Sequence, residues 1–211
     1  RKDDIVTKMT GGIQFLFRKN KITLLKGHAS FEGKGADGYQ VKIDGKDKET
    51  VTAKNVIIAT GSKARHLPGL PVDNVLICDN EGALKFDSVP KKLGVIGAGV
   101  IGLELGSVWR RLGSEVTVLE ALPSFLAACD VSIAKEAQKL FTKQGLNINM
   151  GVKIGDVKAD KKGVVVNYTD SAGKAAKLEC DRLIVSVGRV PNTDKLGLDK
   201  IGLKVDERGF I

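Results

Sequence analysis

Residues 93–120 read LGVIGAGVIGLELGSVWRRLGSEVTVLE, and this stretch decides the fold. A short apolar segment runs through a glycine-rich turn into an amphipathic segment that stops at Gly113, and the alternating segment EVTVLE follows. This order of strand, helix and strand predicts a β-α-β unit with parallel strands. The apolar face expected on the helix, with Trp109 as a core residue, consists of Leu105, Val108, Trp109 and Leu112.

The turn between the first strand and the helix has the spacing G-x-G-x-x-G and consists of Gly97, Ala98, Gly99, Val100, Ile101 and Gly102. Gly97 permits a tight turn, Gly99 lacks the Cβ that would keep a pyrophosphate away, and Gly102 lets the helix approach the strand. The start of the helix offers unpaired N–H groups and the positive end of its dipole to phosphate groups. The turn therefore predicts a dinucleotide site.

Glu120 ends the second strand, at the place where this fold uses a carboxylate to bind the ribose hydroxyls of the adenosine half. The same carboxylate repels a 2′-phosphate, and no arginine follows it in the sequence Ala121-Leu122-Pro123. NAD is therefore favoured over NADP. From the residues alone, Glu104 is either a charge in the first turn of the helix or a cofactor contact.

The rest of the chain alternates helix and strand patterns. Asp130 is expected to cap a second helix that stops near Gly145 and carries Ile133, Ala137, Leu140 and Phe141. Strand patterns follow at 146–150, around 152–157, at 164–170, 176–180 and 183–188, with Cys180 as a small buried side chain. Before the turn we expect a helix over 2–19, strands at 21–31, 39–44 and 49–53, and at 55–60 a strand buried on both faces.

Two segments of the chain share one layout. YQVKID…ETVTAKNVIIATGS and VVVNYTD…AKLECDRLIVSVGR each contain two alternating strands, a charged link and an apolar strand that ends in glycine. Aligning Gly61 with Gly188 superposes them, which indicates an internal duplication. Generic β-meanders are the alternative explanation.

Composition narrows the function classes. The 211 residues are 42% hydrophobic and 28% charged, as in globular proteins, and no apolar run is long enough to span a membrane. The net charge of +9 is spread along the chain without basic and aromatic clusters, which argues against nucleic-acid binding. The three cysteines are few and scattered, which favours a reducing cytoplasm. Neither these cysteines nor the two isolated histidines have the spacing of a metal site, so no metal site is predicted.

The sequence resembles the dihydrolipoamide dehydrogenases, the flavin-dependent members of 2-oxo-acid dehydrogenase complexes, within the flavoprotein pyridine nucleotide-disulfide oxidoreductases. The resemblance is carried by the stretch around the turn, by KNVIIATGS at 54–62, by DRLIVSVGRVPNTDKLGL from 181, and by MTGGIQFLFRKNKITLLKGHASF at 9–31. It implies an α/β fold: a Rossmann-like NAD-binding domain with a parallel sheet and a β-meander, joined to a partial FAD-binding domain. The expected division is 1–80 for the partial FAD domain, 81–190 for the NAD domain, and 191–211 for a return into the FAD or central domain.

The resemblance also assigns binding residues. It implies that Gly97 through Glu104, Leu103 included, line the pyrophosphate and nicotinamide, and that Glu120 holds the adenine ribose. Ile154 is then expected beside the adenine and Gly188 on the nicotinamide side. On the flavin side the expected contacts with the adenosine half of FAD are Ala29, Thr60, Gly61 and Ser62.

The sequence also departs from the family. The family's FAD-binding glycine motif, its redox cysteine pair and its His-Glu acid–base pair are absent from these residues, so no catalytic residue is predicted. We therefore expect a central fragment of an enzyme that oxidises lipoyl-domain dihydrolipoamide with NAD⁺. We expect the fragment to be inactive alone and monomeric, whereas its parent would be a homodimer. Another NAD-preferring flavoprotein disulfide reductase, a transhydrogenase and a non-catalytic NAD-binding module are the alternatives.

Overall fold

The computed structural model describes residues 1–46 and 48–211. Asp47, in the polar link between the predicted strands at 39–44 and 49–53, lies outside the described residues. The chain divides into two compact units, one formed by Arg1–Gly61 with Pro191–Ile211 and the other by Ser62–Val190. Residues 62–80, which the sequence analysis groups with the first domain, belong here to the second unit.

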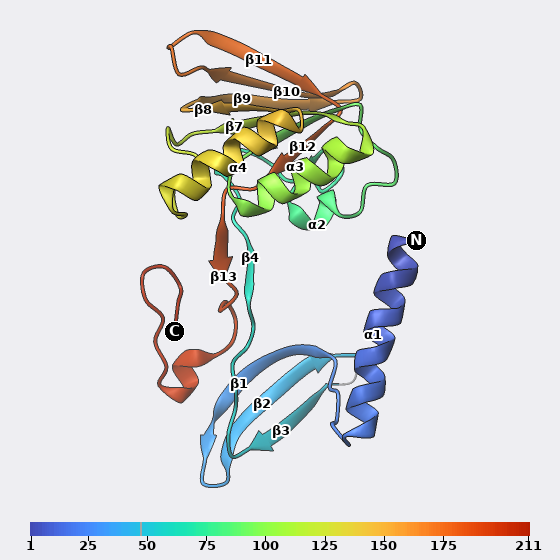
Figure 1. Ribbon diagram of the computed structural model, residues 1–211. Coiled ribbons are helices and arrows are strands. Elements are labelled where there is room, and N and C mark those ends of the chain that lie inside the picture. The colour runs from blue at the N-terminus through green and yellow to red at the C-terminus, as the bar shows by residue number, and fades with distance from the viewer. Residues whose placement is uncertain (47) are drawn as a thin grey trace. The chain divides into compact units, whose positions relative to one another are not determined.

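The second unit is built on a five-stranded parallel sheet with the strand order β5-β12-β6-β7-β8. The strands are β5 (Ile77–Cys78), β6 (Lys92–Ile96), β7 (Glu115–Glu120), β8 (Leu146–Met150) and β12 (Arg182–Val185). Figure 1 shows two helices, α3 (Val100–Leu112) and α4 (Val131–Lys143), on one face of this sheet, while a three-stranded antiparallel meander lies on the other face. The meander consists of β9 (Lys153–Asp160), β10 (Gly163–Thr169) and β11 (Ala175–Cys180). The predicted α/β fold is confirmed.

Each face of the parallel sheet has its own core. Val95 and Val118 point toward the helices, where Leu103 and Leu146 pack with them. Ile96 and Leu119, their neighbours along the same strands, pack instead against the meander. Because successive side chains of a strand point to opposite faces, a sheet covered on both sides needs the continuous apolar strands that the sequence contains.

Helix α3 begins and ends where the sequence predicts, and Gly113 closes it in a left-handed conformation. Its buried face is different from the predicted one, since Val108 and Leu112 are exposed while Gly102, Leu103 and Gly106 are buried. The two glycines have no side chain, so the helix axis approaches the sheet along their side. Trp109 is half-buried against Phe86, as expected of a core residue.

Helix α4 is capped as predicted, because the Asp130 side chain accepts a hydrogen bond from the Ser132 N–H at 2.9 Å. Of the apolar residues that it carries, Ile133 and Leu140 are exposed. Ala134 takes their place in the core, with Ala137 and Phe141 beside it. A short helix, α2 (Asn80–Ala83), and the paired segments β4 (Ser62–Ala64) and β13 (Arg189–Pro191) complete the regular elements of this part of the chain.

The first unit contains the helix α1 (Lys2–Lys19), a 3₁₀ helix η1 (Leu198–Ile201) and an antiparallel meander. The meander is formed by β1 (Gly27–Gly35), β2 (Gly38–Gly45) and β3 (Glu49–Ala53). Phe31, Leu196 and Leu198 form its small core. The helix α1 is present as predicted, but none of its residues is buried.

Two strand predictions in the first unit are wrong. Residues 22–26 are not in a strand, and β1 starts only at Gly27, where pairing with Gly45 begins. Residues 55–60 form no strand, and the side chain of Ile57 is 91% exposed. A strand exists only through its hydrogen-bonded neighbours, and within the described residues no strand pairs with either segment.

The predicted duplication is visible in the two meanders. Tyr39 pairs with Ala53 in β2–β3, and Val164 pairs with Cys180 in β10–β11. The glycine before each of these pairs has a positive φ, +131° at Gly38 and +135° at Gly163. A Cβ on either glycine would lie 2.5 Å from the carbonyl oxygen of Ala53 or Cys180. The repeat thus extends to register and backbone conformation in the meanders, but not to the segment at 55–60.

Candidate dinucleotide-binding site

The candidate site lies at the carboxyl end of β6, in the middle of the parallel sheet. From β6 the chain passes through α3 to β7 on one side, and it later returns as β12 on the other side of β6. Ligands of open parallel sheets bind at such a switch point, where the connections leave the sheet in opposite directions. The turn that starts at Gly97 occupies this position.

The turn is tight, as the sequence predicts. Gly97 has a φ of +105°, and its N–H donates to the Leu119 carbonyl at 2.8 Å, which extends the β6–β7 ladder by one bond. A Cβ at Gly97 would overlap the carbonyl oxygen of Ser186, and a Cβ at Gly102 would overlap that of Gly97 itself. Glycine is therefore required at both positions by close backbone contacts.

The middle glycine is different, because it faces open space. A Cβ built on Gly99 would meet no protein atom within 4 Å, and its φ of −74° is accessible to any residue. Gly99 is the N-cap of α3, no side chain caps the helix, and no acidic residue lies in its first turn. Within the described residues, the N–H groups of Val100, Ile101 and Gly102 have no hydrogen-bond partner. We call these three N–H groups, together with the open space at Gly99, the cradle. The cradle has the donors and the space that a pyrophosphate requires.

The remaining residues of the turn support it from behind. The Leu103 N–H donates to the Gly99 carbonyl at 3.0 Å, and the Leu103 side chain is buried in the helix-side core. Leu103 thus has its side chain in the core and its N–H bonded within the turn. Ala98 is also buried, and its N–H is already engaged by Glu120.

Glu120 lies beside the turn, partly buried, with both carboxylate oxygens in use. Oε2 accepts the Ala98 N–H at 2.6 Å, and Oε1 accepts the Leu122 N–H at 2.8 Å. Each carboxylate oxygen has a second lone pair, so the group can still accept hydrogen bonds from ribose hydroxyls. The spacing in the sequence predicts a carboxylate at this place, but its bond to the turn is visible only in the structure.

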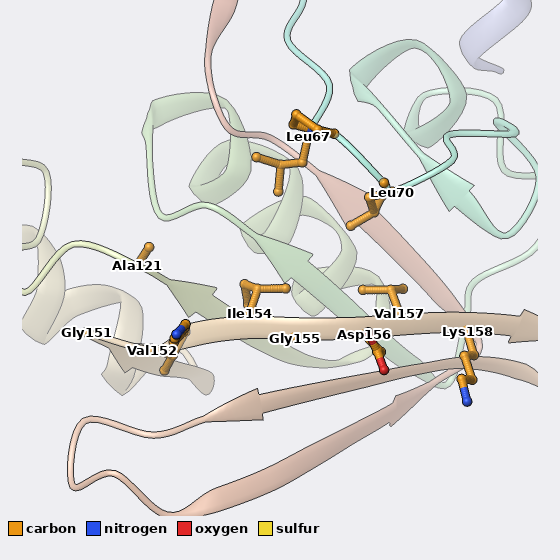
Figure 2. Close-up of a pocket in the computed structure, with 13 residues that line it drawn as sticks. Leu67, Leu70, Ala121, Gly151, Val152, Ile154, Gly155, Asp156, Val157 and Lys158 are labelled. Carbon is orange, nitrogen blue, oxygen red and sulfur yellow. The ribbon is translucent and has the colours of Figure 1, made fainter.

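A groove of about 1010 Å³ extends from the residue after Glu120. Figure 2 shows Ile154 and Val157 of β9 on the same side of the strand as Leu67 and Leu70, whereas Asp156 and Lys158 lie on the opposite side. Ala121 and Gly151 line the same groove. Ile154 thus lies on the apolar wall of the groove. Leu67, Leu70 and Val157 are missed by sequence reasoning. Val157 shares a side with Ile154, three residues before it, because the β9–β10 register shifts between Val166 and Tyr168, so strict period-two alternation would not have found it.

Glu104 and Gly188 lie at other places around the turn. Glu104 is exposed and is the fifth residue of α3, so it lies just beyond the first turn in which the sequence analysis considers it. Gly188 lies two residues beyond Ser186, has a φ of +109° and faces open space. Its carbonyl accepts the Arg65 N–H at 3.0 Å.

The residues predicted to contact a flavin are not gathered into one site by the described contacts. Ala29 is exposed on β1, opposite Ile43. Thr60 and Gly61 are exposed, and their carbonyls accept hydrogen bonds from the side chain and the backbone N–H of Asn192 at 3.4 and 3.0 Å. These contacts are with protein partners only.

Arg189 is a polar anchor that sequence reasoning missed. Its guanidinium donates to the Ser62 hydroxyl at 2.7 Å, to the Ser62 carbonyl, and to the Asn80 side chain at 3.3 Å. The signal for it was the repeat, since aligning Gly61 with Gly188 aligns Ser62 with Arg189. The hydrogen bonds that Arg189 donates to Ser62 therefore hold the segment that follows Gly188 in place.

Asp79 is a second missed polar residue. It is buried, caps α2 and lies 3.3 Å from His66 Nε2. Burial alone would raise the pKa of Asp79, but hydrogen bonds from the Glu81 and Gly82 N–H groups, from His66 and from Asn74 outweigh it and hold the pKa below its ordinary value. Its environment is therefore that of a structural cap.

The family model described as pyridine nucleotide-disulphide oxidoreductase matches residues 2–211. The chain belongs to this family. Family members close in sequence include the dihydrolipoyl dehydrogenase of Cupriavidus necator, 72% identical over all of this chain and 44% of that protein. Dihydrolipoyl dehydrogenase 3 of Pseudomonas putida is 45% identical over the whole chain and 45% of its own length.

Solved structures of pyridine nucleotide-disulphide oxidoreductase type share the fold. LpdA from Mycobacterium tuberculosis superposes with a TM-score of 0.84 at 23% identity, over 98% of this chain and 45% of its own. The flavoprotein disulfide reductase RclA from Escherichia coli superposes with a TM-score of 0.75 at 26% identity, over 97% of this chain and 46% of its own. The chain thus spans less than half the length of these relatives. The resemblance to the dihydrolipoamide dehydrogenases is confirmed.

Two further findings bear on the kind of site. Among the described residues no helix is both long and apolar enough to cross a membrane. In the same part of the chain no group of three or more His, Cys, Asp or Glu side chains is placed to hold a metal ion.

Proposed function

We propose that this chain binds NAD(H) at the Gly97 turn, as part of a dihydrolipoamide dehydrogenase. The observation that carries the proposal is the open cradle at Gly99 next to the carboxylate of Glu120. The pyrophosphate would accept hydrogen bonds from the N–H groups of Val100, Ile101 and Gly102. Glu120 would accept from the adenine ribose, and the positive end of α3 would stabilise the phosphate charge.

The two ends of the cofactor follow from the surroundings of the turn. The apolar wall of the groove, with Ile154 on it, would take the adenine. Gly188 and Glu104 would lie on the nicotinamide side, and the open space at Gly188 allows a close backbone contact. In this proposal 81–190 form the NAD-binding domain.

The 72% identity to a dihydrolipoyl dehydrogenase supports the wider activity. In the complete enzyme, dihydrolipoamide on a lipoyl domain would be oxidised with reduction of NAD⁺ to NADH. FAD would supply the electron transfer between dithiol and nicotinamide, and 1–80 would belong to its domain, with contacts at Ala29 and Thr60 to Ser62. The parent is proposed to be a homodimer in the cytoplasm. The 211 residues alone should not turn over dihydrolipoamide.

Cofactor titration tests the proposal. NADH should bind the chain more tightly than NADPH, because the Glu120 carboxylate repels a 2′-phosphate. Glu120→Ala should weaken NADH by about ten-fold and reduce the preference over NADPH. Glu115→Ala is the matched control, since Glu115 begins the same strand at its other end. Tighter binding of NADPH, or lipoamide-dependent NADH production by this chain, would contradict the proposal.

A further inference from the structure

The Glu120 carboxylate is bonded to the turn before any ligand is bound. The β6–β7 ladder pairs Ile96 with Leu119, and the Gly97 N–H then donates to the Leu119 carbonyl. The next N–H along the turn, that of Ala98, donates to Glu120 Oε2 at 2.6 Å. A side-chain oxygen thus takes the place of a ladder carbonyl at the point where the two strands diverge.

The second carboxylate oxygen fixes the side chain in this position. Oε1 accepts the Leu122 N–H, two residues further along the chain, which orients the group toward Ala98. Hydrogen bonds between an N–H and an ionised carboxylate are shorter and stronger than those between neutral groups. Ala98 is only 2% exposed, and loss of the carboxylate would take away the acceptor that its N–H has in the protein.

Ala98 stands directly before Gly99, at which the cradle opens. The cradle amides of Val100, Ile101 and Gly102 have no partner of their own among the described residues, so their direction depends on how the turn before them is held. We infer that Glu120 is a positioning residue for the pyrophosphate: by holding the Ala98 N–H it fixes the amide cradle that receives the phosphates. The inference rests on the proposed function and adds a second role to the ribose contact.

The two roles predict opposite signs for one measurement. Glu120 carries a negative charge close to the cradle, so if it contacts only ribose, removing the charge should leave the affinity for inorganic pyrophosphate unchanged or raise it. If Glu120 holds the cradle, removing it should lower that affinity despite the relief of repulsion. Inorganic pyrophosphate contains no ribose, so the ribose contact does not contribute.

Two substitutions distinguish the effect of the Glu120 charge from the effect of the length of its side chain. Glu120→Gln keeps the length of the side chain, but one of the two N–H groups then faces an amide donor in place of an acceptor. Glu120→Asp keeps the charge but withdraws the carboxylate by one methylene, about 1.5 Å. The local bond to the Leu122 N–H remains accessible to aspartate, whereas Ala98 is out of its reach. Glu115→Gln is the control for the loss of one negative charge on the same strand.

The experiment uses the full 211-residue chain, with pyrophosphate titrated while backbone amide resonances are followed by NMR. Glu120→Gln and Glu120→Asp should each weaken pyrophosphate binding by about ten-fold, and Glu115→Gln by less than about two-fold. In the ligand-free protein, both Glu120 variants should move the Ala98 amide resonance upfield and shift those of Val100 to Gly102. The Glu115 variant should leave these resonances in place.

The outcomes are distinguishable from a failure of the proposed function. If the wild type binds NADH but the Glu120 variants keep pyrophosphate affinity and the cradle resonances unchanged, the positioning role is refuted and the NAD site remains. If the wild type binds pyrophosphate but not NADH, and the Glu120 variants weaken pyrophosphate binding, NAD binding fails and the positioning role holds. The two Glu120 variants change the side chain in different ways. If one of them fails to fold, the other still tests the positioning role.

Discussion

Gly102 and Gly106 lie one turn apart on the buried face of α3, and the same substitution should have opposite effects at the two positions. At Gly106 an added Cβ would lie 3.5 Å from Val116 Cγ1 and 3.7 Å from Leu146 Cδ2, which are ordinary van der Waals distances. At Gly102 it would overlap the Gly97 carbonyl oxygen and lie 3.3 Å from Val95 Cγ1. The Gly97 carbonyl oxygen belongs to the backbone, so it cannot rotate away from the added Cβ as a side chain could.

The magnitudes follow from these contacts. Gly106→Ala removes conformational freedom from the unfolded chain and buries a methyl group, so the free energy of unfolding should rise by about 1 kcal/mol. Gly102→Ala forces α3 away from β6, and such overpacking costs about 1–3 kcal/mol. The gain in helix propensity offsets only part of this cost. The two variants should therefore differ by about 3 kcal/mol, with the wild type between them.

Urea unfolding followed by tryptophan fluorescence suits this comparison. The chain contains one tryptophan, Trp109, which lies on α3 itself and packs on Phe86 at a centroid distance of 5.1 Å. The signal therefore reports the unit that contains the substitutions. Equal midpoints for the two variants, or a Gly106→Ala protein less stable than the wild type, would refute the packing argument.

Two further predictions concern thiols and acid. Burial raises the pKa of the Cys78 and Cys180 thiols to about 11, whereas Cys129 is exposed, so a disulfide reagent at about pH 8 should titrate one thiol in the native protein and three after denaturation. Rapid reaction of more than one native thiol would contradict the burial. The pKa of Asp79 is lower in the folded than in the unfolded chain, whose value is the ordinary 3.8. The charged carboxylate therefore stabilises the fold at pH values above 3.8, and this stabilisation is lost as the pH falls through and below 3.8. Asp79→Asn keeps the oxygen that caps the helix but removes the charge. In chemical denaturation, the free energy of unfolding of this variant should therefore fall less between about pH 6 and about pH 3 than that of the wild type. Equal losses would assign the acid sensitivity to other groups.

Local patterns predicted the β-α-β unit because each of its elements meets its own requirements. Gly102 packs against Gly97, five residues before it, and Asp130 caps the helix that directly follows it. Period-two alternation likewise located both meanders. These features depend on near neighbours, so one short stretch of sequence specifies them.

Features that depend on distant partners were not predictable. The segment at 55–60 reads as a buried strand, yet without a paired neighbour Ile57 remains exposed. Periodicity assigned Val108 and Leu112 to the buried face of α3, but the small size of Gly102 and Gly106 turned another face to the sheet. Glu120 was expected from its spacing, whereas its bond to Ala98 arises only when β6 and β7 are paired.

The strand order has a consequence for how this chain folds during synthesis. β12 pairs with both β5 and β6, although it follows them by about a hundred residues. A ribosome-bound chain that ends before Arg182 can pair β6 with β7 but must leave the other edge of β6 open. The Ser186 carbonyl, against which Gly97 packs, is equally missing at that stage. Nascent chains released after about residue 190 should therefore be the first to protect the glycine turn from proteolysis.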